Sequence, residues 1–118
     1  MPWWSSRRVV VHDESMLPTL RAGDRLIVDR RAYRRGTPRT GEIVVLADPD
    51  APERWLVKRI AAVGPATDPE VVPAGAVFVL SDAPGTGRDS RRFGPVPVDR
   101  LLGRAVRRYY PADRRSEL

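Results

Sequence analysis

The sequence predicts a mainly β fold, either compact coiled antiparallel sheets or a small barrel, with little helix. Short runs of aliphatic and β-branched residues recur along the chain, as they do in strands. The 12 prolines and 9 glycines divide the 118 residues into short segments separated by turns. This near-regular spacing fits antiparallel strands better than an alternation of strands with helices.

Strands are expected wherever such a run lies between turn residues. The first two, at 7–12 and 25–29, flank a loop that contains Pro18 and the turn Ala22-Gly23-Asp24. The runs 43–46 and 55–63 are predicted to form a hairpin, because Asp48-Pro49-Asp50-Ala51-Pro52 separates them. Three further segments complete the prediction: a strand at 76–80, a glycine-rich loop at 83–87, and 101–110 as a strand or as a short helix followed by a strand.

The chain length predicts one domain over residues 1–118, with its core at about 7–110 and flexible termini at 1–6 and 112–118. Every apolar run is shorter than the roughly 18 residues needed to span a bilayer. The N-terminal residues also lack the apolar core of a secretory signal. A cytoplasmic protein is therefore expected, with peripheral membrane contact through Trp3 and Trp4 as the alternative.

The composition argues against several classes of partner and cofactor. The net charge is +6, but the arginine pairs are dispersed and often lie beside acidic residues, which indicates a solvated surface and no nucleic-acid partner. With no cysteine and one histidine, neither a disulfide framework nor a metal site is expected. No cofactor is expected either.

Lys58 is the single lysine among 21 basic residues, and the others are all arginine. Arginine stays protonated in proteins, whereas a desolvated lysine can lose its proton and act as a base. On an extended strand, Lys58 shares a face with Leu56 and Ile60, and that apolar face would lower the pKa of the amine. The alternative is a lysine at a strand edge whose ammonium reaches water.

A serine that Lys58 could activate follows the first expected strand. Ser15 precedes Pro18, which forces a turn that could present the hydroxyl and the Ser15 N–H to the same space. The alternative is a serine that caps a helical turn. His12 and Asp13 do not complete a Ser-His-Asp triad, because neighbouring side chains of an extended segment point to opposite faces.

Four ordered blocks resemble the type I signal peptidases of family S26, which are serine endopeptidases. Together they extend from about residue 9 to 106. The blocks are Ser15-Met16-Leu17-Pro18-Thr19-Leu20 with Gly23-Asp24, then Gly41-Glu42-Ile43-Val44-Val45, then Val57-Lys58-Arg59-Ile60, and finally 78–82 with 89–97 and 103–105. The resemblance implies the β fold of the signal peptidase catalytic core. It also implies that Ser15 is the nucleophile and Lys58 the general base.

The same resemblance implies an acyl-enzyme mechanism and a substrate bound as an extended strand. The substrate would be a precursor protein or leader peptide with small side chains before the cleavage point. Candidates for oxyanion stabilisation and substrate binding are Asp13, Met16, Ser81 and Asp82. Asp89 and Arg91 match a family pair that forms a structural salt bridge in the active-site loop.

Two positions depart from the family pattern. Asp13 stands where many members carry a serine that donates to the oxyanion, and a carboxylate there would repel the oxyanion and raise the pKa of Lys58. Either Asp13 points away, with the Ser15 N–H as the main donor, or the enzyme is slow. Gly87 replaces a second serine, which orients the lysine, and either Ser81 or Thr86 could supply that hydroxyl.

The sequence leaves three functions open. The leading one is an endopeptidase that removes an N-terminal leader from a precursor protein. The chain resembles the short proteases that process the nickel superoxide dismutase precursor in its length and in the box Asp-Ser-Arg-Arg-Phe-Gly-Pro-Val-Pro at 89–97. A self-cleaving peptidase of the repressor type needs a cleavage site within the 14 residues before Ser15. The third is a peptide-binding module without catalysis.

Overall fold

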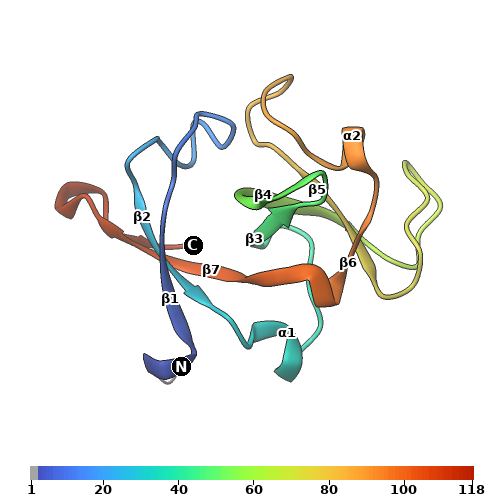
Figure 1. Cartoon of the computed structure of the whole chain (residues 1–118), viewed down its shortest axis with the longest axis horizontal. Helices are drawn as coiled ribbons and strands as arrows, with labels where there is room; N and C mark the ends of the chain where they lie inside the picture. The colour runs from blue at the N-terminus through green and yellow to red at the C-terminus, as the bar shows by residue number, and fades with distance from the viewer. Residues whose placement is uncertain (1–2) are drawn as a thin grey trace.

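A computed structural model describes residues 3–118 of the chain as one open antiparallel sheet (Figure 1). The strands pair in the order β1-β2-β7-β3-β4-β5-β6, and β8 pairs with β7. The mainly β prediction is confirmed, but the sheet does not close into a barrel. The strands are β1 (Ser6–Val10), β2 (Arg25–Asp29), β3 (Ile43–Asp48), β4 (Ala51–Val63), β5 (Ala76–Leu80), β6 (Val96–Pro97), β7 (Leu101–Tyr110) and β8 (Ser116–Glu117).

Helices are short and lie at the ends of strands. Within the described residues, the two α-helices are α1 (Ala32–Arg35) and α2 (Ser90–Phe93), and three 3₁₀ turns cover Trp3–Ser5, Val98–Arg100 and Ala112–Arg114. Residues 101–110 are strand throughout, so the alternative with a helix in this segment is wrong. No helix within residues 3–118 is long and apolar enough to cross a membrane.

Strand β3 lies between two apolar clusters, which is why its sequence is apolar without alternation. Ile43 and Val45 point into one cluster, with residues of β1, β2 and the loop that follows β1. Val44 and Leu46 point into the other, with residues of β4, β5 and β6. Because the sheet coils around β3, both of its faces are removed from water, and each such side chain contributes about 1.5–3 kcal/mol.

The hairpin of β3 and β4 has a tighter turn than the sequence predicts. Asp48 pairs with Ala51, and the Asp48 carboxylate accepts a hydrogen bond from the Asp50 N–H at 2.9 Å. This side-chain bond closes the turn within the predicted loop. Strand β4 therefore begins at Ala51, four residues earlier than expected.

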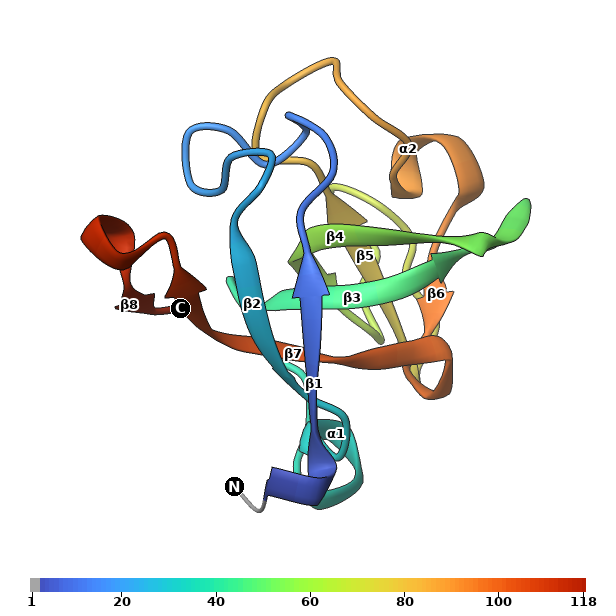
Figure 2. The ribbon, with the colours of Figure 1, turned by 60° about the vertical axis from the view of Figure 1, so that its left-hand side comes forward.

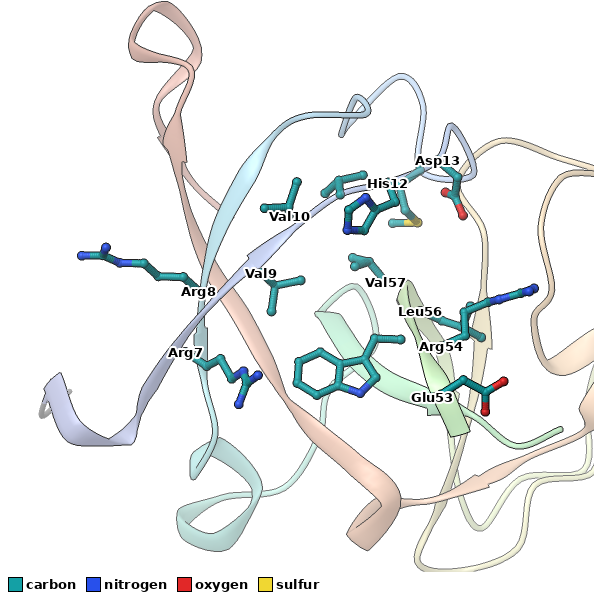
Figure 3. A pocket seen from close by; sticks show the side chains of 13 residues that line it. Arg7, Arg8, Val9, Val10, His12, Asp13, Glu53, Arg54, Leu56 and Val57 are labelled. Atoms are coloured by element: carbon teal, nitrogen blue, oxygen red, sulfur yellow. The ribbon is translucent and has the colours of Figure 1, made fainter. Parts of the chain in front are cut away.

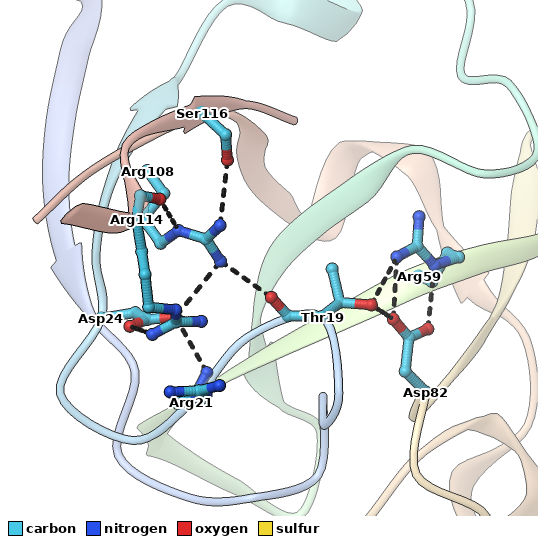
Figure 4. Close-up of polar contacts among 8 residues, drawn as sticks. All are labelled: Thr19, Arg21, Asp24, Arg59, Asp82, Arg108, Arg114 and Ser116. Carbon is cyan, nitrogen blue, oxygen red and sulfur yellow. Dashed lines mark hydrogen bonds and ion pairs between the residues drawn. The ribbon is translucent and has the colours of Figure 1, made fainter. Parts of the chain in front are cut away.

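The C-terminal segment differs from the flexible tail that the sequence predicts. Ser116–Glu117 forms β8 against β7, and the Leu118 N–H bonds to the Val106 carbonyl at 3.0 Å. The buried Asp24 carboxylate binds Arg114 at 2.6 Å and Arg108 at 3.4 Å, and Arg108 also donates to the Thr19 carbonyl at 2.8 Å (Figure 4). These ion pairs attach residues 112–118 to the loop that follows β1.

We expect Asp24→Asn to lower the free energy of unfolding by about 2 kcal/mol. The replacement leaves the Arg108 and Arg114 guanidinium groups, which are 12% and 19% exposed, without their carboxylate. Urea unfolding monitored by tryptophan fluorescence measures the change. Asp113→Asn is the matched control, because Asp113 is exposed and its replacement should change stability by less than about 0.5 kcal/mol. Equal stability of the two variants would contradict a stabilising role for the Asp24 pairs.

Candidate active site

Lys58 lies on the inward face of β4. The strand alternates as its sequence predicts: Leu56, Lys58 and Ile60 are buried, whereas Val57 and Arg59 between them are partly exposed. Only 1% of Lys58 is exposed. The aliphatic stem therefore packs in the core, and the amine reaches the loops at the end of β1.

Ser15 meets the Lys58 amine from the loop that follows β1. The Lys58 Nζ donates to the Ser15 Oγ at 2.9 Å, although 43 residues separate the two in the sequence. Met16 and Leu20 are fully buried and anchor this loop in the core. The Ser15 carbonyl accepts a hydrogen bond from the Ala83 N–H at 2.9 Å, which joins the loop to residues 81–89. The structure thus brings the two predicted catalytic residues together.

Asp13 binds Ser15 directly instead of pointing away. One carboxylate oxygen accepts the Ser15 N–H at 3.0 Å and the Ser15 hydroxyl at 2.8 Å. The expectation that Asp13 could turn away and leave the Ser15 N–H free is therefore wrong for this state. Ser15 stands between a carboxylate and an amine, with its hydroxyl proton directed at the carboxylate.

Ser81 supplies the second hydroxyl that the sequence left open between Ser81 and Thr86. The Lys58 Nζ donates to the Ser81 Oγ at 3.0 Å, and the Ser81 hydroxyl donates to the Thr86 carbonyl at 2.8 Å. The Thr86 hydroxyl instead donates to the Ala83 carbonyl at 2.7 Å. A Cβ at Gly87 would lie 2.9 Å from the Lys58 Nζ and 3.4 Å from the Ser81 Oγ. Glycine at 87 leaves the space in which Ser81 contacts the amine.

Burial and nearby carboxylates shift the pKa of Lys58 in opposite directions. Burial lowers the pKa of Lys58, while the negative charges of Asp13 and Asp89 act in the opposite direction without restoring its ordinary value. Burial acts to raise the pKa of Asp13, but the hydrogen bonds from Ser15 and the positive charge of Lys58 hold that pKa below its ordinary value. Lys58 is thus closer to losing its proton than an exposed lysine, while Asp13 stays ionised at neutral pH.

Asp82 joins the two loops and does not face the hydroxyl of Ser15. Its carboxylate accepts two hydrogen bonds from Arg59 at 2.8 Å each and one from the Thr19 hydroxyl at 2.7 Å (Figure 4). One carboxylate oxygen therefore bonds Arg59 of β4, and the other bonds both Arg59 and Thr19 of the loop that carries Ser15. This favours a positioning role for Asp82 over contact with substrate.

Ion pairs also hold the loop at 81–89 from its other end. Arg91 binds Asp89 through two nitrogens, at 2.7 and 3.1 Å, as the resemblance implies, and Asp89 accepts the Ser81 N–H at 3.0 Å. Sequence reasoning missed a second pair: Arg88 binds the fully buried Asp48 at 2.7 Å, and it also contacts Asp50. The two carboxylates of the hairpin turn, Asp48 and Asp50, indicate that a basic partner is needed, but nothing in the sequence identifies Arg88 as that partner.

A groove of about 800 Å³ runs from this site between β1 and the first half of β4. Figure 3 shows His12 and Asp13 at one end of the groove and Arg7 at the other. Residues 55–58 of β4 pair with β3 on one side only, because β5 pairs with β4 from Arg59 onward. Strand β1 is likewise at the end of the strand order. Two strand edges thus border the groove, and Met16 lines it beside Ser15.

A serine hydroxyl bonded to a buried lysine amine at the end of an extended groove is typical of peptidases. Comparison with known proteins agrees with this class. The family model described as signal peptidase, peptidase S26, matches residues 4–68 and 62–110. The chain belongs to this family.

Individual relatives come from organelles and from bacteria. The mitochondrial ATP-independent inner membrane protease subunit 1b of Arabidopsis thaliana is 38% identical over 82% of this chain and 66% of its own length. The signal peptidase I of Leptolyngbya laminosa is 31% identical over 92% of this chain and 70% of its own length. The chain therefore spans about two thirds of the length of these relatives.

We expect Gly87→Ala to lower peptidase activity by at least about tenfold, because its Cβ would lie 2.9 Å from both the Lys58 Nζ and the Ser15 Cβ. Gly85→Ala is a matched control. Both glycines have positive φ, at +69° and +76°, but a Cβ at Gly85 meets nothing within 4 Å. The two variants share the backbone strain, so the ratio of their kcat/KM values measures the contact. Equal losses would show that Gly87 serves the loop backbone alone.

Proposed function

We propose that this chain is a serine endopeptidase that removes a signal or leader peptide from a precursor protein with Ser15 and Lys58 as a catalytic dyad. The observation that carries the proposal is the 2.9 Å contact between the Ser15 hydroxyl and an amine that is 1% exposed. Such an amine loses its proton more readily than one in water. Membership of the signal peptidase family supports the reaction type.

The reaction proceeds through an acyl-enzyme. Neutral Lys58 takes the Ser15 proton as the Ser15 Oγ attacks the scissile carbonyl, and the resulting ammonium then protonates the leaving amine. Water attacks the ester, Lys58 accepts its proton, and Ser15 regains a hydroxyl proton when the acid product leaves. The bond between Lys58 and Ser81 keeps the amine aimed at Ser15. Ser81 is therefore a positioning residue.

The groove supports the binding of an extended substrate. A peptide strand in it would meet the free edge of β1 and the free edge of β4 at 55–58, so its backbone could pair on both sides. Specificity would then come from side-chain pockets at alternate positions. The buried Met16 lines the groove directly after Ser15, and a preference for small side chains before the cleavage point stays a prediction.

One observation favours a second candidate, a peptide-binding module without catalysis. The Asp13 carboxylate occupies the Ser15 N–H, the donor on which an oxyanion would depend. A protein locked in this state would bind extended peptides in the same groove without cleaving them. Measuring both cleavage and binding of leader peptides distinguishes this candidate from the endopeptidase.

Location and substrate identity stay predictions. Trp3 and Trp4 are 84% and 49% exposed and could contact a membrane surface, although Arg31 lies over the ring of Trp4 at 4.8 Å. The relatives from Arabidopsis and Leptolyngbya leave the cytoplasmic prediction untested, as they do processing of a nickel superoxide dismutase precursor.

We expect Ser15→Ala and Lys58→Met each to lower kcat by at least about 1,000-fold on leader peptides with alanine before the cleavage point. Lys58→Met keeps the length of the side chain, so its fold should survive and its free energy of unfolding should equal or exceed that of the wild type. Mass spectrometry measures cleavage, and a trapped acyl-enzyme should add the leader mass to Ser15. If the wild type and both variants bind these peptides alike and none cleaves, the binding module is the function.

We expect Asp13→Asn to move the acid limb of the kcat/KM profile to lower pH. Activity requires neutral Lys58, so it rises as the pH passes the pKa of the amine. Burial and Arg91 lower this pKa, whereas Asp13, Asp89 and Asp48 raise it, so removing the Asp13 charge lowers it further. His12→Gln is the control, because it tests whether the neighbouring imidazole causes the limb. If the acid limb of Asp13→Asn stays at the same pH or moves to higher pH, the Asp13 charge does not raise the pKa of Lys58.

A further inference from the structure

The Asp13 carboxylate occupies both groups of Ser15 on which acylation depends. A single oxygen accepts the N–H at 3.0 Å and the hydroxyl at 2.8 Å. Attack requires the hydroxyl proton to face Lys58 and the N–H to face the substrate carbonyl oxygen. In the structure, the proton faces Asp13 and the N–H is already bonded. Asp13 must therefore leave Ser15 before the serine can react.

Charge repulsion gives the same requirement. The scissile carbonyl gains negative charge in the transition state, and an ionised carboxylate at hydrogen-bond distance from the Ser15 N–H would oppose it. Lys58 cannot follow the carboxylate outward, because its amine is buried and bonded to Ser15 and Ser81. The group that moves is Asp13, which is exposed and lines the groove.

The groove decides what could draw the carboxylate away. Asp13 lies at the end of the groove beside His12 (Figure 3), and the only hydrogen bonds of its carboxylate within the described residues are those from Ser15. A neutral side chain of a bound peptide offers it no better partner, and an acidic one repels it. A positively charged side chain in the groove would pair with the carboxylate and keep it off Ser15.

We propose that Asp13 is a specificity-determining residue, which selects peptides that carry a positively charged side chain at one of the two residues flanking the scissile bond. The proposal rests on the proposed endopeptidase function. Binding of such a peptide transfers the carboxylate from Ser15 to the substrate cation. The Ser15 N–H then becomes available to the oxyanion, and the hydroxyl proton becomes available to Lys58. A substrate without this charge competes with Asp13 for Ser15 and is cleaved slowly.

Peptide pairs test the selection by charge alone. Each pair carries lysine or norleucine, which has the same side chain without the amine, at the residue before or after the cleavage point. For the wild type at pH 8, kcat/KM should be about threefold to fivefold higher for lysine at one of the two positions. In Asp13→Asn the ratio should fall to about one, and cleavage of the norleucine peptide should become faster.

Glu14→Gln provides the matched control for net charge. It removes an exposed carboxylate from the residue beside Asp13, whereas the hydrogen bonds of the Ser15 N–H and hydroxyl are made with Asp13 and Lys58. This variant should keep the preference for lysine. Loss of the preference in Glu14→Gln as well would attribute it to the general field of the groove and overturn the role of Asp13. A wild-type ratio of one at both positions would overturn it too, while cleavage itself would still support the endopeptidase.

Binding measurements keep the inference testable without cleavage. In Ser15→Ala, which retains the backbone N–H at position 15, fluorescence anisotropy should give a lower Kd for the lysine peptide than for the norleucine peptide. The double variant Asp13→Asn/Ser15→Ala should bind both alike. If the wild type cleaves no peptide but this difference in Kd is present, the endopeptidase proposal fails and selection by Asp13 stands. Equal Kd values in both backgrounds would refute the selection.

Discussion

The Lys58 amine is buried away from water, and the arrangement of the surrounding loops depends on this burial. Taking an ammonium from water into a protein interior costs several kcal/mol unless hydrogen bonds replace those of water. Here the acceptors are the hydroxyls of Ser15 and Ser81, which come from two different loops. Both loops must be in place at once for the amine to be buried and bonded. The same enclosure lowers the pKa of the amine, as its proposed role as proton acceptor requires.

Arginine carries out a different task in the same region. Arg59 forms an ion pair with Asp82, which also accepts a hydrogen bond from Thr19 of the Ser15 loop. Arg91 forms an ion pair with Asp89, which also accepts the Ser81 N–H. A planar guanidinium that cannot lose its proton suits such fixed, two-point contacts. The division explains why one lysine stands among arginines. Arginine makes the fixed contacts of these loops, and the one position that we propose to exchange a proton with Ser15 holds lysine.

Sequence reasoning located Ser15 and Lys58 because their signals are local: a strand with a period of two, and a serine before a turn. It could not choose between Ser81 and Thr86, since the choice depends on how the backbone of one loop folds back on Lys58. It also missed the pairing of Asp24 with Arg108 and Arg114, which are 84 and 90 residues away in sequence. Contacts of that kind follow from the coiling of the sheet, and the periodicity of the sequence does not predict them.

The two strand edges beside the groove have a consequence for the free protein. An unpaired edge can accept a strand from any chain, including a second copy, so it invites self-association. At the β1 edge, Arg7 and Arg8 are exposed next to each other. Two copies that approached through this edge would bring their arginines together and repel. Such repulsion would oppose the pairing of two copies through the β1 edge, whereas a peptide strand without this pair of arginines would not meet it.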